Sequence, residues 1–132
     1  MRQDVLIVDG YNIIGDWPEL QQLKMKNLAL ARDALLERMS EYQAQTKARV
    51  IIVFDAYMRE GIETHGKYRN IEVVFTRENE IADERIEKLV TEMNDRRTNI
   101  HVATSDATEQ WVIFGTGASR MSARELQLAH EQ

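Results

Sequence analysis

Three aspartates stand at or just beyond the ends of short apolar runs. Asp9 ends the stretch VLIVD, Asp55 follows VIIVF, and Asp106 follows a run that ends in Thr-Ser. If these runs are parallel strands of one sheet, their carboxyl ends meet at one edge, which is where open α/β sheets bind ligands. Like charges at short range repel, so such an edge needs a bound cation or carboxyl groups with raised pKa values.

A fourth aspartate belongs to a helical pattern between residues 78 and 95. On a helical wheel centred on Ile86, the apolar residues form one stripe and Asp83 falls at its edge. Asp83 also lies near the start of this helix, where the helix dipole favours a negative charge. We therefore predict that Asp83 faces the sheet. The remaining acids of the stretch are predicted to form a solvated face with ion pairs to Arg85 and Lys88; they are Glu78, Glu80, Glu84 and Glu87.

Asp9, Asp83 and Asp106, with Asp55 nearby, would form a site made of oxygen ligands alone. Hard oxygen ligands suit Mg²⁺ or Mn²⁺ and not zinc. Such an ion can activate a water and stabilise the leaving oxygen when a phosphodiester is cleaved. Asn12 could orient the water, a carboxylate or a phosphate oxygen, although an amide at such a turn often bonds only its own backbone.

The elements that must position these acids follow from the apolar patterns. Strands are predicted at Val5–Val8, Val50–Phe54, Ile71–Phe75 and Ile100–Thr104. Helices are predicted from about 28 to 45 with Asn27 as cap, from about 78 to 95 with Thr76 as cap, after Asp106 as far as Gly115, and after the capping-box pair Ser122 and Glu125. Alternating strands and helices predict an α/β fold, a three-layer α/β/α sandwich around a mostly parallel sheet of four or five strands.

The residues Ala56–Asn70 show no clear periodicity and are predicted to form one long functional loop. This segment carries Arg59, Lys67 and Arg69, and Arg77 follows the next strand. We expect these four basic groups to lie near the acidic edge and to bind substrate. The alternative is that they are solubilising charges of a loop.

Composition narrows the class of protein. The chain has 132 residues, which suits one domain, and a net charge of −5, which argues against bulk attraction to nucleic acid. It has no cysteine, which excludes disulfides and thiolate metal sites and is compatible with the cytoplasm, where we expect the protein to act. The three histidines are scattered, and neither a G-x-G-x-x-G motif nor a Walker A lysine is present, so zinc and common nucleotide sites are not indicated.

Five stretches of the sequence together resemble one known family. They are VDGYN, VFDA, FTRENEIADERIEKL, VATSDATEQWVIFGTGA and SARELQ, and they extend from Val5 to about Leu126. The chain resembles the YacP-like branch of the NYN nucleases, which are relatives of PIN domains. The resemblance implies a single PIN-like domain over residues 1–132 and metal-dependent endoribonuclease activity, with some members acting on mRNA at the ribosome. Family members continue beyond the position of Gln132, so we expect a C-terminal extension to be lacking from this sequence.

By the same resemblance, Asp9, Asp83 and Asp106 would be the catalytic acids that hold Mg²⁺ or Mn²⁺. Asp55 would be an auxiliary acid and Asn12 a further site residue. The partners implied are RNA, chiefly mRNA, and the ribosome, with no membrane. Two alternatives stay open: an aspartate-based phosphotransfer domain with Asp9 as phospho-acceptor, and a non-catalytic adaptor that binds RNA or the ribosome.

Overall fold

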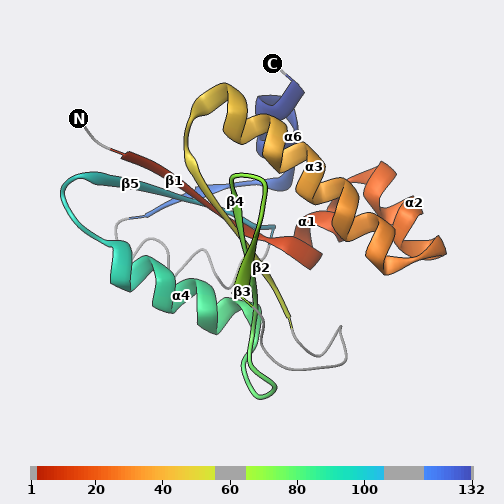
Figure 1. Ribbon diagram of the computed structural model, residues 1–132, viewed down its shortest axis with the longest axis horizontal. Helices are drawn as coiled ribbons and strands as arrows, with labels where there is room; N and C mark the ends of the chain where they lie inside the picture. The colour runs from red at the N-terminus through yellow and green to blue at the C-terminus, as the bar shows by residue number, and fades with distance from the viewer. Residues whose placement is uncertain (1–2, 56–64, 106–117, 132) are drawn as a thin grey trace.

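A six-stranded sheet forms the centre of the computed structural model, which describes residues 3–55, 65–105 and 118–131 (Figure 1). The strands are β1 (Gln3–Asp9), β2 (Arg49–Phe54), β3 (His65–Tyr68), β4 (Ile71–Phe75), β5 (Thr98–Ala103) and β6 (Ser119–Met121). They lie in the order β3-β4-β2-β1-β5-β6, and β3 alone is antiparallel to its neighbour. The predicted mostly parallel sheet is thus confirmed, with one more strand than expected.

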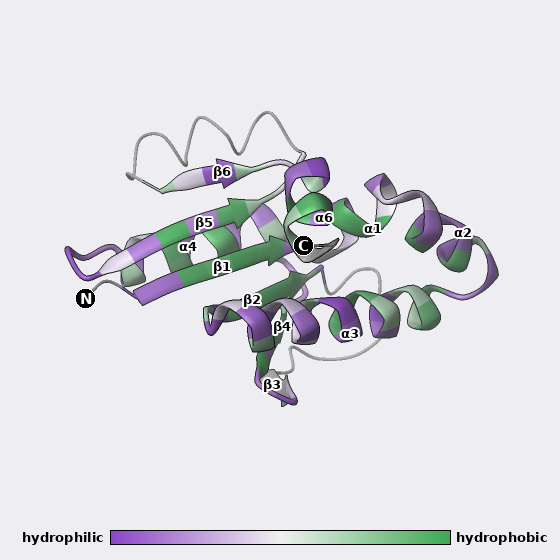
Figure 2. Ribbon diagram, turned by 90° about the horizontal axis from the view of Figure 1, so that it is seen from above, coloured by the Kyte–Doolittle hydropathy of each residue, from purple (hydrophilic) through white to green (hydrophobic). Residues whose placement is uncertain are grey.

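The central strands are apolar on both faces because helices cover both. Alternate residues of β1 enter two different cores: Leu6 and Val8 lie on one face, and Val5 and Ile7 on the other. All four of these side chains are buried. Figure 2 shows the same strands becoming apolar from their amino ends towards their carboxyl ends.

Helices complete the outer layers of an α/β/α sandwich. They are α1 (Gly10–Asp16), α2 (Pro18–Lys26), α3 (Leu28–Thr46), α4 (Ala82–Met93) and α6 (Ala123–Glu131). The apolar side of α4 packs on one face of the sheet through Ile86 and Val90. On the other face, α1, α3 and α6 share a core that includes Ile13, Leu35 and Leu126 (Figures 1 and 2). The three-layer prediction is confirmed.

Two predicted helix caps are present and one is wrong. The Asn27 side chain accepts a hydrogen bond from the Ala29 amide at 2.8 Å, and the Ser122 hydroxyl accepts one from the Glu125 amide at 3.0 Å. Thr76 caps no helix, because it extends the sheet edge: its amide donates to the carbonyl of Phe54 at 2.9 Å. The helix that was expected from residue 78 begins only at Ala82.

Four described elements are absent from the sequence prediction, namely α1, α2, β3 and β6. Part of the predicted loop Ala56–Asn70 is the strand β3, which forms a tight hairpin with β4 through Arg69, whose φ is 55°. The stretch that follows Asp9 is a helix rather than a turn because Tyr11, Ile13 and Ile14 all find buried positions. The short helix predicted between Asp106 and Gly115 lies outside the described residues.

The strand order creates one special crevice. From β1 the chain moves to β2 and β4 on one side, and then crosses to β5 and β6 on the other. The crevice between the carboxyl ends of β1 and β5 is therefore the topological switch point, the usual ligand site of open α/β sheets. Within the described ranges, no helix is long and apolar enough to cross a membrane.

Candidate active site

Asp9 ends β1 at the switch point and is only 6% exposed. Its strand pairs with β5 up to the pair Val8 and Ala103, so the next residue of β5's chain, Thr104, lies beside Asp9. The Thr104 hydroxyl donates to Asp9 Oδ2 at 3.3 Å and is itself fully buried. The structure therefore confirms the predicted position of Asp9 at the carboxyl edge of the sheet.

Asn12 ties the first turns of α1 to the segment that follows β5. Its Oδ1 accepts hydrogen bonds from the Ser105 amide at 2.6 Å and from the Ser105 hydroxyl at 2.8 Å. Because a backbone amide can only donate, the oxygen of the Asn12 side chain must face Ser105, and its NH₂ group points elsewhere. Asn12 thus bonds a backbone group 93 residues away and not its own turn.

The amide of Asn12 holds the residue immediately before Asp106. Asp106 itself lies outside the described residues, so its predicted place beside Asp9 stays a prediction. What is described is that Thr104 and Ser105 lie against Asp9 and Asn12. Ser105, the residue before Asp106 in the sequence, therefore lies at the switch point.

Asp55 connects the end of β2 to the start of α4. Its Oδ1 accepts a hydrogen bond of 2.5 Å from the Ala82 amide, the first residue of the helix. Partial burial raises the pKa of Asp55, and the hydrogen bond from Ala82 opposes part of that rise. A carboxylate at this point satisfies an amide that has no partner within the helix, and it faces the positive end of the helix dipole.

Asp83 follows Ala82 in the first turn of α4 and is half-buried. The helix lies over β1, β2 and β5. Arg85, about 160° around the helix from Asp83, lies on the flank next to Arg77, which follows β4. Asp83 is consequently on the opposite flank, the one towards β1 and β5. Its role as a metal ligand stays a prediction.

Position 10, next to Asp9, has no room for a side chain larger than that of glycine. A Cβ atom at this position would collide with the ring of Phe54, which packs against the start of α1. The same ring lies 4.9 Å from that of Tyr11, centroid to centroid. The backbone after Asp9 is thus fixed by close packing against the end of β2.

The four basic residues predicted to bind substrate do not gather at one place. Arg69 lies in the β3–β4 hairpin, before the amino end of β4, and pairs with Glu37 at 3.1 Å. Its predicted place near the carboxyl edge is wrong, because the antiparallel hairpin puts it at the opposite end of the sheet. Lys67 stands in register with Glu72, also towards that end, and Arg59 lies outside the described residues. Arg77 is exposed two residues beyond β4, on the expected edge.

Glu80 departs most from its prediction. It was expected on a solvated face, but it is only 7% exposed. The predicted ion pairs to Arg85 and Lys88 are present, with contacts of 2.7 and 2.8 Å. Although burial by itself raises the pKa of Glu80, the hydrogen bonds from these two cations lower it to about 2.

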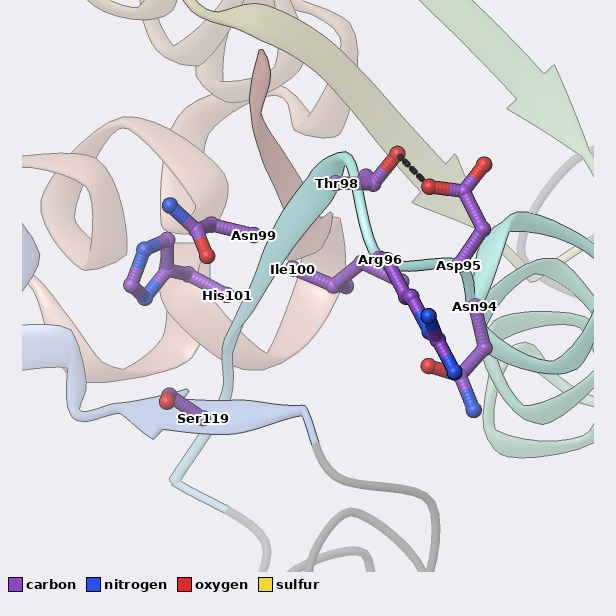
Figure 3. Close-up of a pocket in the computed structure, with 8 residues that line it drawn as sticks. All are labelled: Asn94, Asp95, Arg96, Thr98, Asn99, Ile100, His101 and Ser119. Atoms are coloured by element: carbon purple, nitrogen blue, oxygen red, sulfur yellow. Dashed lines mark hydrogen bonds between the residues drawn. The ribbon is translucent and has the colours of Figure 1, made fainter. Parts of the chain in front are cut away.

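A polar hollow of about 450 Å³ lies at the other end of the sheet (Figure 3). It is bordered by the turn before β5 and by the first residues of that strand, far from the carboxyl edge. Its side chains diverge: Asn99 and His101 point to one side of β5, whereas Asn94 and Arg96 point to the other. This hollow is not part of the candidate active site.

The polar groups described at the carboxyl ends of β1, β2 and β5 and at the start of α4 are carboxylates, hydroxyls and amides. Among the residues that the structure describes, no three acidic or histidine side chains are close enough to form a metal cluster. The carboxylates of Asp9, Asp55 and Asp83 nevertheless have the donor chemistry of a Mg²⁺ or Mn²⁺ site. Thr104 and Ser105 are additional candidate site residues, because they bond Asp9 and Asn12; in the sequence they were only the polar end of an apolar run.

Comparisons with known proteins agree with this fold. A family model described as the YacP-like NYN domain matches residues 6–132. YacP of Bacillus subtilis (strain 168) is 58% identical over 123 residues, which cover 93% of this chain and 72% of that protein. Two crystal structures of Rae1 (YacP) from Bacillus subtilis each align with a TM-score of 0.87. The mutant form is 54% identical and the other 56%; each alignment covers 98% of this chain, and 76% and 74% of the respective crystal chains.

Proposed function

Because the chain belongs to the YacP-like NYN domain family, we propose that it is a metal-dependent endoribonuclease that hydrolyses single-stranded RNA at the carboxyl edge of its sheet. The observation that carries this proposal is the switch-point cluster. There, Asp9 and Asn12 are joined by hydrogen bonds to Thr104 and Ser105. These groups come from two segments more than 90 residues apart, at the place where open α/β sheets bind ligands.

In this proposal, Asp9, Asp83 and Asp106 hold one or two Mg²⁺ or Mn²⁺ ions. The bound metal supplies an activated water and neutralises charge on the phosphate. All three acids then have to face one crevice. The position of Asp83 on the flank of α4 towards β1 and β5 favours this arrangement, as does the anchored Ser105 just before Asp106.

The remaining polar groups of the edge orient the reactants and the acids. The NH₂ group of Asn12 is not used by Ser105 and can donate to a phosphate oxygen of the substrate or to water. Asp55 fixes the first turn of α4 and thereby the position of Asp83.

The proposed substrate is mRNA, with the ribosome as the context in which it is met and the cytoplasm as the place. This part of the proposal rests on the resemblance of the sequence motifs to ribosome-associated members of the family. Exposed Arg77, on the same edge as the acids, is the basic residue of the described set that favours contact with RNA.

The test is a cleavage assay on labelled single-stranded RNA with Mn²⁺, with and without translating ribosomes. It uses the parent protein, Asp83→Asn and Glu84→Gln; the last is a neighbouring exposed acid and serves as the matched control. We expect the parent and Glu84→Gln to cut, and Asp83→Asn to lose at least about 100-fold in rate, as for loss of an electrostatic catalytic group. Failure of the parent to cut RNA in either setting would favour the adaptor, and an acid-stable phosphate on Asp9 would favour phosphotransfer.

A further inference from the structure

Three cationic side chains border a small pocket on the flank of α4 that faces β4. The pocket has a volume of about 240 Å³ and is lined by Arg77, Arg85, Lys88, Leu89 and Glu92. A water molecule occupies about 30 Å³ in the liquid, so this space can hold a phosphate group with several waters. In a protein with a net charge of −5, this concentration of positive charge is local and specific.

The buried carboxylate of Glu80 fixes two of the three cations. Its Oε1 accepts from Arg85 Nε at 2.9 Å, and its Oε2 accepts from Lys88 Nζ at 2.8 Å. The Arg77 amide donates to the same carboxylate at 3.4 Å, which ties the segment after β4 to the helix. The side chains of Arg85 and Lys88 are thus held in place before any ligand arrives, so less of their side-chain freedom is lost on binding.

Both charge and exposure leave this pocket able to take an anion. Three positive groups face two carboxylates, those of Glu80 and Glu92. The Lys88 side chain is 62% exposed, and its ammonium group has two further N–H donors besides the one directed at Glu80. Arg77 is exposed on the other side of the pocket.

The pocket adjoins the candidate active site through the start of α4. Arg77 lies two residues beyond the carboxyl end of β4, and Ala82 is bonded to Asp55 at the end of β2. Arg85 is three residues further along the helix, a rise of about 4.5 Å. A single-stranded RNA that crosses the acidic edge at Asp55 would therefore pass close to the pocket.

We propose that this pocket binds a backbone phosphate of single-stranded RNA flanking the scissile bond, with Arg77 and Lys88 as contact residues and Glu80 as the positioning residue. The proposal rests on the proposed ribonuclease function for its substrate. It adds a binding site on the β4 side of α4, on the opposite flank of this helix from Asp83, for a phosphate that is not cleaved. Contact there is sequence-independent because it involves only the backbone.

The test compares two double variants that each remove two positive charges. Arg77→Gln/Lys88→Gln alters the pocket, whereas Arg96→Gln/Arg97→Gln alters exposed arginines at the opposite end of the sheet. Both are made in an Asp9→Asn background, and binding of a labelled RNA without base pairing is measured as a function of salt. Loss of one phosphate contact makes the slope of log K against log salt less steep by about 0.7. Lowering the salt from 1 M to 0.1 M then strengthens binding roughly fivefold less than it does for the protein with the intact pocket.

We expect the pocket variant to show this change and the control variant to keep the slope of the Asp9→Asn protein. Equal effects of both variants, no effect of either, or no RNA binding by the Asp9→Asn protein would overturn the proposal. Should the pocket variant unfold, Arg77→Gln against Arg97→Gln repeats the comparison with single exposed residues.

Separate outcomes distinguish this site from the nuclease proposal. If the pocket variant loses RNA binding but the protein with Asp9 intact cuts no RNA, the proposed phosphate site is supported and the proposed nuclease activity is refuted. If the same two substitutions in the protein with Asp9 intact leave both KM and the rate of RNA cleavage unchanged, the proposed nuclease activity is supported and the proposed phosphate site is refuted. Glu80→Gln should raise KM more than it lowers kcat, because it only positions the contact residues.

Discussion

Two carboxylates near the carboxyl edge are buried almost equally, but the partners that the structure describes for them differ in kind. Glu80 is 7% exposed and Asp9 is 6% exposed. Glu80 meets two cations of the helix that follows it, Arg85 and Lys88. Asp9 meets the neutral hydroxyl of Thr104 at the topological switch point. Burial alone therefore does not identify a functional acid; the chemical type of its neighbours and its place in the topology do.

The comparison leads us to expect opposite responses to removal of charge. An acid that is neutralised inside the protein contributes to stability, so its loss unfolds the chain more easily. An acid held for a metal contributes to activity, and its loss leaves stability unchanged or improved.

Glu80→Gln should cause the largest loss of stability. The pKa of Glu80 is lowered from 4.5 to about 2, which corresponds to about 3 kcal/mol of unfolding free energy at neutral pH. Since the pKa is lowered by folding, this stability is present above pH 4.5 and is lost as the pH falls towards 2. Urea unfolding between pH 2 and 7 measures it, with Glu87→Gln as an exposed control. A pH-independent difference would contradict the role of the charge.

Gly10→Ala should be next, at about 1–3 kcal/mol, because the added methyl group collides with the ring of Phe54 in a packed core. Gly15→Ala in the same helix is the matched control, since a Cβ there has nothing within 4 Å. Alanine at that exposed helix position should stabilise the protein by up to about 1 kcal/mol. Thermal unfolding distinguishes the two, and equal effects would refute close packing beside Asp9.

Asn12→Ala should lower the rate of RNA cleavage by about tenfold, or about 1.4 kcal/mol, with little change in stability. The variant removes the acceptor of the Ser105 amide and so loosens the segment that carries Asp106. Cleavage kinetics with Mn²⁺ give the rate, and calorimetric titration gives the metal affinity. An unchanged rate would mean that Asn12 serves the fold alone.

The strands that hold the site were predictable because their signal is local. The runs that became β1, β2, β4 and β5 are apolar and β-branched, and each reveals a strand without knowledge of the rest of the chain. Asp9 and Asp55 followed from those strand ends. By contrast, β3 has the sequence HGKY, which has no apolar alternation, and it forms only because the exposed edge of β4 is available for pairing.

The misplaced side chains were those whose positions depend on where an element begins or on distant partners. The helical wheel placed Glu80 towards water because it assumed a helix from residue 78, whereas α4 begins at Ala82 and Glu80 precedes it. Arg69 was expected at the acidic edge because the hairpin that reverses the chain was not recognised. The bond between Asn12 and Ser105 spans 93 residues, and only the strand order reveals it.

The most direct test of the central claim is single-turnover cleavage of single-stranded RNA with Mn²⁺ by three proteins: the parent, Asp9→Asn and Asp4→Asn. Asp4 lies on the same strand but at its exposed amino end, so it controls for the change of an aspartate to asparagine in β1. Asp9→Asn should lose at least about 100-fold in rate. It should also unfold at the same or a higher urea concentration than the parent, and Asp4→Asn should cut as the parent does. Cleavage by Asp9→Asn at the parent's rate would contradict the assignment of this edge as the active site.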